Sequence, residues 1–301
     1  MDIGIFLKSA NHSYFEKVLT YFAEGIKKQG DNPIIIDKEA YQDFDVSVFF
    51  GSWKNSNYSH HVLKREIVKK SNKFVCLETP LIGRREVKQI FDDDSFRVGV
   101  NGFLNNSGIF YKGNCPSDRW DLISKKFNLK LEDWNIPNPN APILVALQLP
   151  HDSSLRGCNI IEWAFKVSKQ IRSVSKRKII VRTPQLEKKY EKKWIDELMK
   201  INDVFFQTGT KKNLIPTLKS CHCSITYTSG LAVDSLINGC PTIACNDGNF
   251  CYEVSQNDPL GVENIKYFDR SQWINNLSYC QWDQLEIKNG KCWSHIKKII
   301  I

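Results

Sequence analysis

A short turn between a strand-like run and a helix-like pattern is the part of the sequence best suited to bind an anion. The turn is formed by Thr228, Ser229 and Gly230, and the helical pattern begins at Leu231. Backbone amides at the start of a helix have no acceptor within the helix, and the helix dipole adds partial positive charge, so this turn suits a phosphate group. Asp234 lies one turn further along the same helix face, where its carboxylate could accept hydrogen bonds from ribose hydroxyls. An ordinary helix cap followed by one exposed acid is the alternative.

Other polar loops follow the strand-like runs of the same half of the chain. Arg156 lies in the loop after the run 143–149, and Arg182 ends the run 178–182. A guanidinium group can pair with an anion in a bidentate geometry, whereas a surface ion pair is the alternative for either arginine. Asp247 belongs to a loop after a later strand. This loop could bind sugar hydroxyls, or it could be a simple turn. Because ligands of parallel sheets bind beyond the carboxyl ends of the strands, these loops are the first candidates for a site.

Strands and helices that alternate along the chain would position these residues. The hydrophobic pattern predicts such an alternation. In the first half, apolar runs at 3–7, 34–36, 46–50 and 74–77 alternate with helical patterns at 14–28 and 60–70. In the second half the expected strands are 143–149, 178–182, 204–206, 223–227 and 242–245, and the expected helices are 158–174, 186–200 and 231–238. The runs are too short for helices and too continuous for exposed antiparallel strands, so we expect an α/β protein with buried parallel sheets. Loops are expected to dominate from 78 to 110.

A proline-rich segment divides the two series of elements. The segment 129–142 contains three prolines with interleaved asparagines, which cannot sustain a helix or a central strand. A chain of 301 residues is long enough for two domains. We therefore expect an N-terminal domain over 1–135, a second domain over 136–270, and a helical tail over 271–301 whose apolar face packs back across the domains.

Composition and charge exclude several classes of protein. With 42% hydrophobic and 25% charged residues, the chain is neither disordered nor fibrous. No window reaches the roughly 20 apolar residues of a membrane span, and residues 1–7 lack the features of a secretory signal, so we expect a cytoplasmic protein with no membrane span. The formal net charge of +9 and the dispersed lysine pairs fit either a polyanionic partner or a solvated surface.

No metal site is expected. The 10 cysteines lie in a long chain without a secretion signal, and several stand in apolar runs, so we expect reduced, buried thiols. The Cys-His-Cys cluster at 221–223 lacks the ligand spacing of a zinc site. The acidic triplet at 92–94 lies far in sequence from the turn at 228–230, and a solvated acidic turn is its simplest interpretation.

The stretch from residue 226 to residue 245 resembles the donor-nucleotide motif of GT-B glycosyltransferases. That motif consists of a strand, a small-residue turn, a helix that bears an acid and a Gly-x-Pro-x-Ile strand, which is Gly239-Cys-Pro-Thr-Ile243 in this chain. The resemblance implies two Rossmann-like domains whose parallel sheets face a cleft, with a C-terminal helical tail. It also implies a nucleotide-sugar as co-substrate and no separate cofactor.

The same resemblance implies donor-site roles for residues of the second half. It places a diphosphate contact in the loop that carries Arg156, and many relatives have glutamate where this chain has Asp234. Arg182-Thr-Pro184 resembles the Arg-Pro-His-Pro element of capsule-type sugar transferases, without its histidine. The expected donor-binding residues are Arg156, Arg182, Thr228, Ser229, Gly230, Asp234 and Asp247.

An inverting transferase also needs a base that takes the proton of the acceptor hydroxyl. Glu78 ends a strand-like run of the first half and has the right topology, although a glutamate before Thr-Pro can also cap a turn. Asp118 and His12 are its rivals. The expected acceptor-side residues are Ser52, Trp53 and Arg84. Trp53 could stack on a base or sugar ring, or it could form the rim of the core.

Further segments are similar to glycosyltransferase-like proteins encoded by tailed bacteriophages. These segments are 77–84, 97–103 and 117–120, together with the loops of the second half. The resemblance implies a location in the host cytoplasm and hydroxymethylated pyrimidine in phage DNA as an acceptor, which the positive charge would suit. A surface or lipid-linked glycan is the other acceptor, and a non-catalytic module that binds nucleotide-sugars is the alternative outside the enzymes. Transfer is expected to proceed with inversion and without a metal, because arginines and a helix terminus can neutralise the leaving diphosphate.

Overall fold

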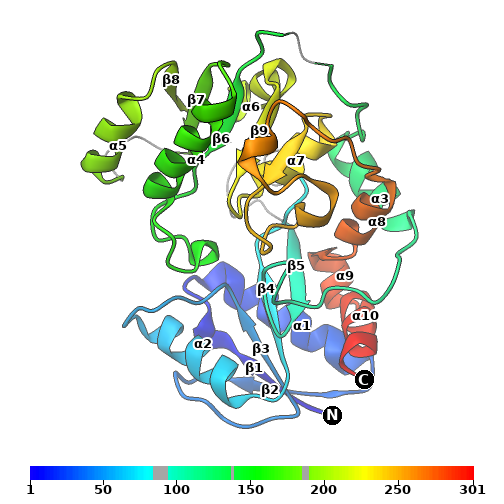
Figure 1. Cartoon of the computed structure of the whole chain (residues 1–301). Coiled ribbons are helices and arrows are strands. Elements are labelled where there is room, and N and C mark those ends of the chain that lie inside the picture. The colour runs from blue at the N-terminus through cyan, green and yellow to red at the C-terminus, as the bar shows by residue number, and fades with distance from the viewer. Residues whose placement is uncertain (84–93, 137–138, 185–189) are drawn as a thin grey trace. The chain divides into compact units, whose positions relative to one another are not determined.

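The chain folds into two compact α/β units (Figure 1). The computed structural model describes residues 1–83, 94–136, 139–184 and 190–301. Unit 1 comprises Met1–Ile123 and Ile274–Ile301, and unit 2 comprises Ser124–Trp273. The sequence analysis placed the boundary at residue 135 and treated residues 271–301 as a separate tail, whereas most of that tail belongs to unit 1 in the structure.

Unit 1 contains a six-stranded sheet, in the described part of the chain, with the order β11-β5-β4-β3-β1-β2. The strands are β1 (Asp2–Phe6), β2 (Asn32–Ile36), β3 (Val46–Phe50), β4 (Phe74–Glu78), β5 (Ser95–Val100) and β11 (Gln281–Asp283). Strands β1 to β4 are parallel, whereas β5 is antiparallel to both β4 and β11. The expectation of loops from 78 to 110 was therefore wrong at β5. One of its partners, β11, lies far away in sequence, so the local pattern does not reveal this pairing.

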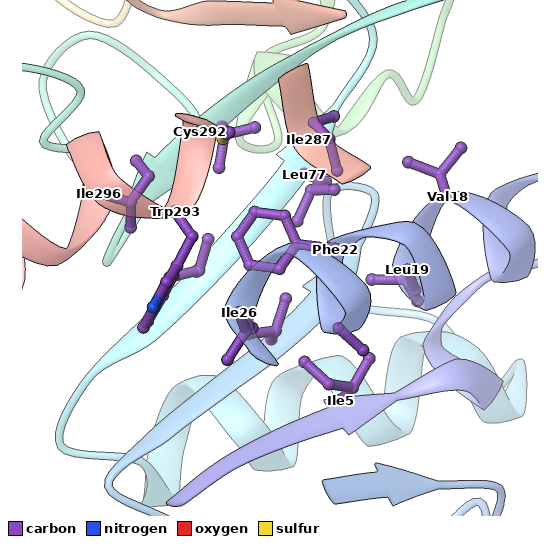
Figure 2. Close-up of a cluster of buried hydrophobic side chains, with 14 of the residues drawn as sticks. Ile5, Val18, Leu19, Phe22, Ile26, Leu77, Ile287, Cys292, Trp293 and Ile296 are labelled. Carbon is purple, nitrogen blue, oxygen red and sulfur yellow. The ribbon is translucent and has the colours of Figure 1, made fainter. Parts of the chain in front are cut away.

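The helices of unit 1 cover both faces of this sheet. They are α1 (Ser13–Lys28), α2 (Ser59–Lys70), α9 (Gln284–Lys288) and α10 (Lys291–Ile300), with the short η1 (Leu7–Ser9) after β1. The boundary between the units falls within α3 (Asp118–Phe127) and within α8 (Ser271–Ser278). Helices α1, α9 and α10 contribute to the core on one face, and α2 contributes to the core on the other. Figure 2 shows Phe22 of α1 among Leu77 of β4 and Ile287 and Trp293 of the C-terminal segment, which explains why that segment belongs to unit 1.

Unit 2 contains a five-stranded parallel sheet, in the part of the chain that the structure describes, with the order β10-β9-β6-β7-β8. The strands are β6 (Ile143–Ala146), β7 (Ile179–Thr183), β8 (Val204–Thr208), β9 (Cys223–Thr226) and β10 (Thr242–Ala244). The chain builds outward from the central β6 to β7 and β8, and then returns to place β9 on the other side of β6. The change of direction falls between β6 and β9, and in open α/β sheets ligands bind at the carboxyl ends of the strands at such a point.

The helices of unit 2 also cover both faces of its sheet (Figure 1). They are α4 (Ile160–Val174), α5 (Lys192–Met199), α6 (Lys211–Ser220) and α7 (Leu231–Ile237), with the short η3 (Ser153–Leu155), η5 (Tyr252–Val254) and η6 (Pro259–Gly261). Helices α4 and α5 pack on one face, and α6 and α7 pack on the other. The sequence analysis did not predict α6, which contains Pro216 but buries Leu214 and Leu218. None of the helices in the described ranges combines the length and hydropathy that crossing a bilayer requires.

Candidate functional site

A hydrogen-bonded pair, Gln148 and Thr228, joins the ends of the two strands between which the unit 2 sheet changes direction. Ala146 and Thr226 are register partners in β6 and β9, and Gln148 and Thr228 each lie two residues further along. The Thr228 amide donates to Gln148 Oε1 at 3.0 Å, and Gln148 Nε2 donates to Thr228 Oγ1 at 3.1 Å. Parallel strands in this register bring their following loops together, so the pair lies at the carboxyl edge where a ligand is expected.

A second set of hydrogen bonds holds Gln148 in place. Gln148 Nε2 also donates to Ser154 Oγ at 2.7 Å, and Ser154 Oγ donates to Asp152 Oδ1 at 2.7 Å. The hydroxyl of Tyr190 donates to the Gln148 carbonyl at 2.8 Å. Gln148 is only 8% exposed, so each of these bonds satisfies a polar group that water cannot reach easily. The sequence analysis did not select Gln148, although its position directly beyond the central strand was a usable signal.

The turn 228–230 offers fewer open amides than the sequence suggested. The Thr228 amide is bonded to Gln148, whereas the amides of Ser229 and Gly230 donate to no protein acceptor within the described residues. Helix α7 after the turn has only seven residues, so the turn amides are stronger candidates for an anion contact than the helix dipole is. Gly230 is exposed with φ −61°, and a Cβ built there would meet no atom within 4 Å. The space over this turn is therefore open to a ligand.

Arg156 lies in the same loop as Gln148 and has an unusual backbone conformation. It is exposed and adopts φ +50°, in the left-handed region, at the end of η3. His151 and Gly157 in this loop also have positive φ angles, of 63° and 88°. A left-handed conformation costs a residue with a Cβ about 1–2 kcal/mol, so the loop keeps the Arg156 backbone in this conformation at an energetic cost.

Arg182 is buried, which fits a positioning role rather than a surface ion pair. Its two terminal nitrogens donate to Gln207 Oε1 at 2.9 Å and to the Thr210 carbonyl at 2.9 Å. Gln207 lies in β8, and Thr210 caps α6. The guanidinium therefore fixes the loop between β8 and α6, next to the end of β7.

The remaining two predicted donor residues lie near the same edge of the sheet. Asp234 is half-buried on α7, and Asp247 is exposed in the loop after β10. That loop is a turn in which Asn246 Oδ1 accepts from the Gly248 amide at 2.9 Å. Asn249 Nδ2 braces the loop by donating to Thr226 Oγ1 at 2.9 Å. These bonds favour the turn interpretation for the asparagines, and Asp247 remains a candidate contact for a sugar.

In unit 1, Glu78 is the last residue of β4 and lies at the carboxyl edge of the sheet. Glu78 Oε2 accepts from the Ser52 amide at 2.8 Å, and Oε1 accepts from the Thr79 amide at 2.8 Å. Burial opposes ionisation of Glu78, but the charge of Arg97 and the two amides outweigh it and hold the pKa of the carboxyl below its usual value. A carboxylate with a lowered pKa is a weaker base, so this geometry suits a group that positions the Ser52 turn.

The two rivals of Glu78 occupy different environments. His12 caps α1, and its Nδ1 accepts from the Tyr14 amide at 3.1 Å, so the proton of the neutral imidazole is on Nε2. Asp118 begins α3, does not follow a strand, and accepts from the Tyr279 hydroxyl at 2.8 Å. Burial and Asp118 raise the pKa of Tyr279 to about 12, so this hydroxyl remains a donor. His12 follows β1 at the carboxyl edge, whereas Asp118 does not share that placement.

Trp53 packs on aromatic side chains of unit 1. Its ring lies 5.8 Å from those of Phe49 and Phe74 and 5.0 Å from that of Phe103. This arrangement is typical of a core rim, which was the alternative interpretation for Trp53. Arg84 lies outside the described residues, as do the first two positions of the acidic triplet at 92–94.

Metal ligands and reactive thiols do not gather in the described residues. No group of three or more His, Cys, Asp or Glu side chains there is placed to hold a metal ion. All 10 cysteines are free thiols. Burial raises the pKa of the Cys115 thiol to about 11 and that of Cys245 to about 12, so these thiols are poor nucleophiles at neutral pH.

Comparison with known proteins identifies structures of the same fold. No protein-family model matches the sequence, and no curated protein matches it. The β-Kdo 2,4 transferase of Thermosulfurimonas dismutans KpsC is 12% identical, with a TM-score of 0.54 over 93% of this chain and 90% of that one. The β-Kdo 2,7 transferase of the same KpsC is 11% identical, with a TM-score of 0.51 over 98% of this chain and 99% of that one. At these identities the likeness concerns the fold alone. The predicted fold, an α/β fold of the GT-B type with parallel sheets, is confirmed.

Proposed function

We propose that this protein is a glycosyltransferase that binds a nucleotide-sugar on unit 2 and transfers the sugar to an acceptor hydroxyl. The observation that carries the proposal is the hydrogen-bonded pair of Gln148 and Thr228 at the point where the unit 2 sheet changes direction. The fold shared with the two Kdo transferases supports a reaction of this class. Nucleotide-sugars combine an anionic phosphate group with hydroxyl-rich rings, which suits a polar edge of this kind.

The donor is proposed to bind through groups that surround this pair. The amides of Ser229 and Gly230 and the guanidinium of Arg156 would hold the phosphate oxygens. Asp234 and Asp247 would accept hydrogen bonds from ribose and sugar hydroxyls. In this assignment Arg182 keeps a positioning role.

Transfer is proposed to be a single displacement with inversion. The acceptor oxygen forms a bond to the anomeric carbon, the bond from that carbon to the phosphate oxygen breaks, and the acceptor proton passes to a base. Arg156 and the turn amides would stabilise the negative charge on the leaving phosphate, so the reaction would not require a metal. Glu78 is the first candidate for the base by its place at a strand end, although its two amide contacts and lowered pKa favour a positioning role. His12 and Asp118 are its rivals. Product anomers assigned by NMR, and activity retained in EDTA, would support these two features.

A thermal-shift screen tests the proposal directly. The panel contains UDP-, GDP-, ADP- and CMP-linked sugars, and a ligand at about 100 times its Kd stabilises a protein by about 2.7 kcal/mol. At least one donor should raise the melting temperature of the wild type and fail to do so when Gly230→Phe fills the space over the turn. If no donor stabilises the protein, the proposal is wrong. Binding without turnover across a broad acceptor panel would support a non-catalytic module instead.

The acceptor is proposed to be a saccharide hydroxyl, on a surface or lipid-linked glycan. The two structures of the same fold are named as a β-Kdo 2,4 transferase and a β-Kdo 2,7 transferase, which favours sugar chemistry. A second candidate is a hydroxymethylated base in DNA, which only the net charge of +9 favours. Duplex binding that weakens steeply with salt, together with sugar transfer to hydroxymethylated DNA, would select the second candidate.

A further inference from the structure

The first turn of α2 in unit 1 has open backbone donors. Tyr58 precedes the helix and provides no side-chain hydrogen bond to cap it. Within the described residues, the amides of Ser59 and His60 donate to no acceptor. Helix α2 has 12 residues, which is long enough for its aligned dipoles to favour an anion at this end.

A buried lysine lies one turn further along the same helix. Lys64 is 4% exposed, and its Nζ donates to the Phe50 carbonyl at 3.3 Å. No carboxylate in the described ranges forms an ion pair with it. Burial lowers the pKa of Lys64, although the charge of Glu78 acts in the opposite direction. An ammonium group with one neutral hydrogen-bond partner and no ion pair is costly to bury, so a bound anion would offset part of that cost.

A second buried side chain of this turn has a ring nitrogen without a hydrogen-bond partner in the described part of the chain. His61 is 8% exposed, and no hydrogen-bond partner of its Nδ1 is found among the residues that the structure describes. Burial lowers the pKa of His61 to about 4, and the charges that add to this effect are all positive: Lys64, His60, Lys54 and Arg65. His61 and Lys64 are three residues apart and therefore share one face of α2. Their side chains lean toward the N-terminus of the helix, where the open amides lie.

Hydrogen bonds from one arginine connect the segment before α2 to the helix. Arg65 donates through one nitrogen to the Lys54 carbonyl at 2.8 Å and to the Ser56 carbonyl at 2.7 Å. Gly51, which follows β3, has φ +84°, and a Cβ there would lie 3.2 Å from Lys64 Nζ. The first turn of α2 therefore lies beside the carboxyl end of β3, the edge of the unit 1 sheet to which Glu78 also belongs (Figure 1).

We propose that Lys64, His61 and the amides of Ser59 and His60 form a binding site for one oxyanion, the carboxylate or phosphate of an acidic saccharide. A small anionic group can complete a buried lysine, whereas duplex DNA is bound through exposed cations that reach its phosphates. If the proposed transferase function also holds, the acceptor is an acidic or phosphorylated sugar rather than a neutral one. This last step rests on the proposed function, whereas the anion site does not.

The test is an amide titration of the ¹⁵N-labelled full chain with glucuronate, glucose 6-phosphate, neutral glucose and a DNA duplex. One or both anions should shift the Ser59 and His60 resonances in a saturable way, and glucose should not. The two anions distinguish a carboxylate ligand from a phosphate ligand, and either supports the site. Equal effects of glucose, no shift at these two amides, or shifts with duplex DNA alone would overturn the proposal.

Two matched variants distinguish a lysine that binds the anion from a lysine with only a structural role. Lys64→Met removes the buried charge, so the ligand-free protein should be at least as stable as the wild type while its affinity for the anion falls at least tenfold. Lys69→Met removes an exposed lysine from the same helix and should leave the affinity unchanged. A destabilised Lys64→Met protein with unchanged anion affinity would refute the site. Nucleotide-sugar binding is measured in a separate experiment. A failed anion titration would therefore not count against nucleotide-sugar binding, and a failed nucleotide-sugar screen would not count against the anion site.

Discussion

The Thr228 amide donates to Gln148 Oε1 at 3.0 Å, and this bond joins the two strands at which the unit 2 sheet changes direction. Gln148 follows the central strand β6, and Thr228 follows β9 on the other side of the change. The bond therefore fixes the position of the 228–230 turn relative to the loop that carries Arg156.

Replacement of Gln148 should weaken both the fold and the donor site. Gln148→Met keeps the size of the side chain but leaves the Thr228 amide and Ser154 Oγ without this partner. Loss of hydrogen bonds at buried groups costs about 1–3 kcal/mol, so the free energy of unfolding in urea should fall by about that amount. Nucleotide-sugar affinity should fall with it. Gln170→Met, at an exposed position of α4, is the control and should change neither quantity.

The space over Gly230 should accept a side chain without loss of stability. Because no atom lies within 4 Å of a Cβ at this position and φ is −61°, Gly230→Ala should be neutral or stabilising by about 0.4–1 kcal/mol. Gly230→Phe should keep the melting temperature and reduce nucleotide-sugar affinity at least tenfold, because the ring occupies the ligand space. Calorimetric titration of both variants checks this, and unchanged affinity of the Phe variant would place the donor elsewhere.

Arg156→Gly should separate stability from binding. Glycine relieves the φ of +50°, so the unfolding free energy should rise by about 1 kcal/mol. Donor affinity should fall about 10- to 100-fold, because a charged hydrogen bond contributes about 1.5–3 kcal/mol. Asp203 has φ +56° at the opposite, amino end of β8, which makes Asp203→Gly a matched control. That variant should gain similar stability with unchanged affinity; a parallel loss of affinity would contradict a direct role of Arg156.

Glu78→Gln should lower stability as well as transfer. An amide can offer one oxygen where the carboxylate accepts from both Ser52 and Thr79, so a loss of about 1–3 kcal/mol in unfolding free energy is expected. Because the pKa of Glu78 is lowered, its stabilising effect is present above about pH 4.3 and is lost as the pH falls through the folded-state pKa. If Glu78 is the base, the acid limb of kcat/KM therefore lies below about pH 4.3. An acid limb near pH 6.5 would instead indicate a histidine.

Asp31 should make the attachment of α10 sensitive to acid. Its Oδ2 accepts from Trp293 Nε1 at 2.7 Å and lies 2.8 Å from Lys297 Nζ. Burial opposes ionisation of Asp31, but Lys297 and Trp293 outweigh it and lower the pKa. Asp31→Ala leaves the buried indole N–H unsatisfied and should cost about 1–3 kcal/mol at pH 7. The difference from the wild type should shrink as the pH falls below about 3.9 and through the folded-state pKa, as urea unfolding at several pH values would reveal. A difference that stays constant across this range would exclude the ion pair as its cause.

Local patterns were sufficient for most of the parallel strands. The apolar runs at Val46–Phe50 and Thr242–Ala244 are strands because a buried parallel strand needs apolar side chains on both faces. The pattern failed at β5 and at β11, since these two strands pair with each other although they are distant in sequence. It also failed at α6, where Pro216 weakens the helical signal.

The sequence by itself determined the α/β class, the place of the turn at 228–230 after a strand, and the polar loops near it, because periodicity and turn chemistry are local properties. Only the tertiary structure decided which amide of that turn is occupied, that Gln148 is its partner, and that Glu78 already accepts two backbone amides. The same is true of Lys64, which is one lysine among many in the sequence and a buried cation in the fold. Burial and hydrogen-bond partners depend on residues that are distant along the chain, and these are brought together only when the sheets form.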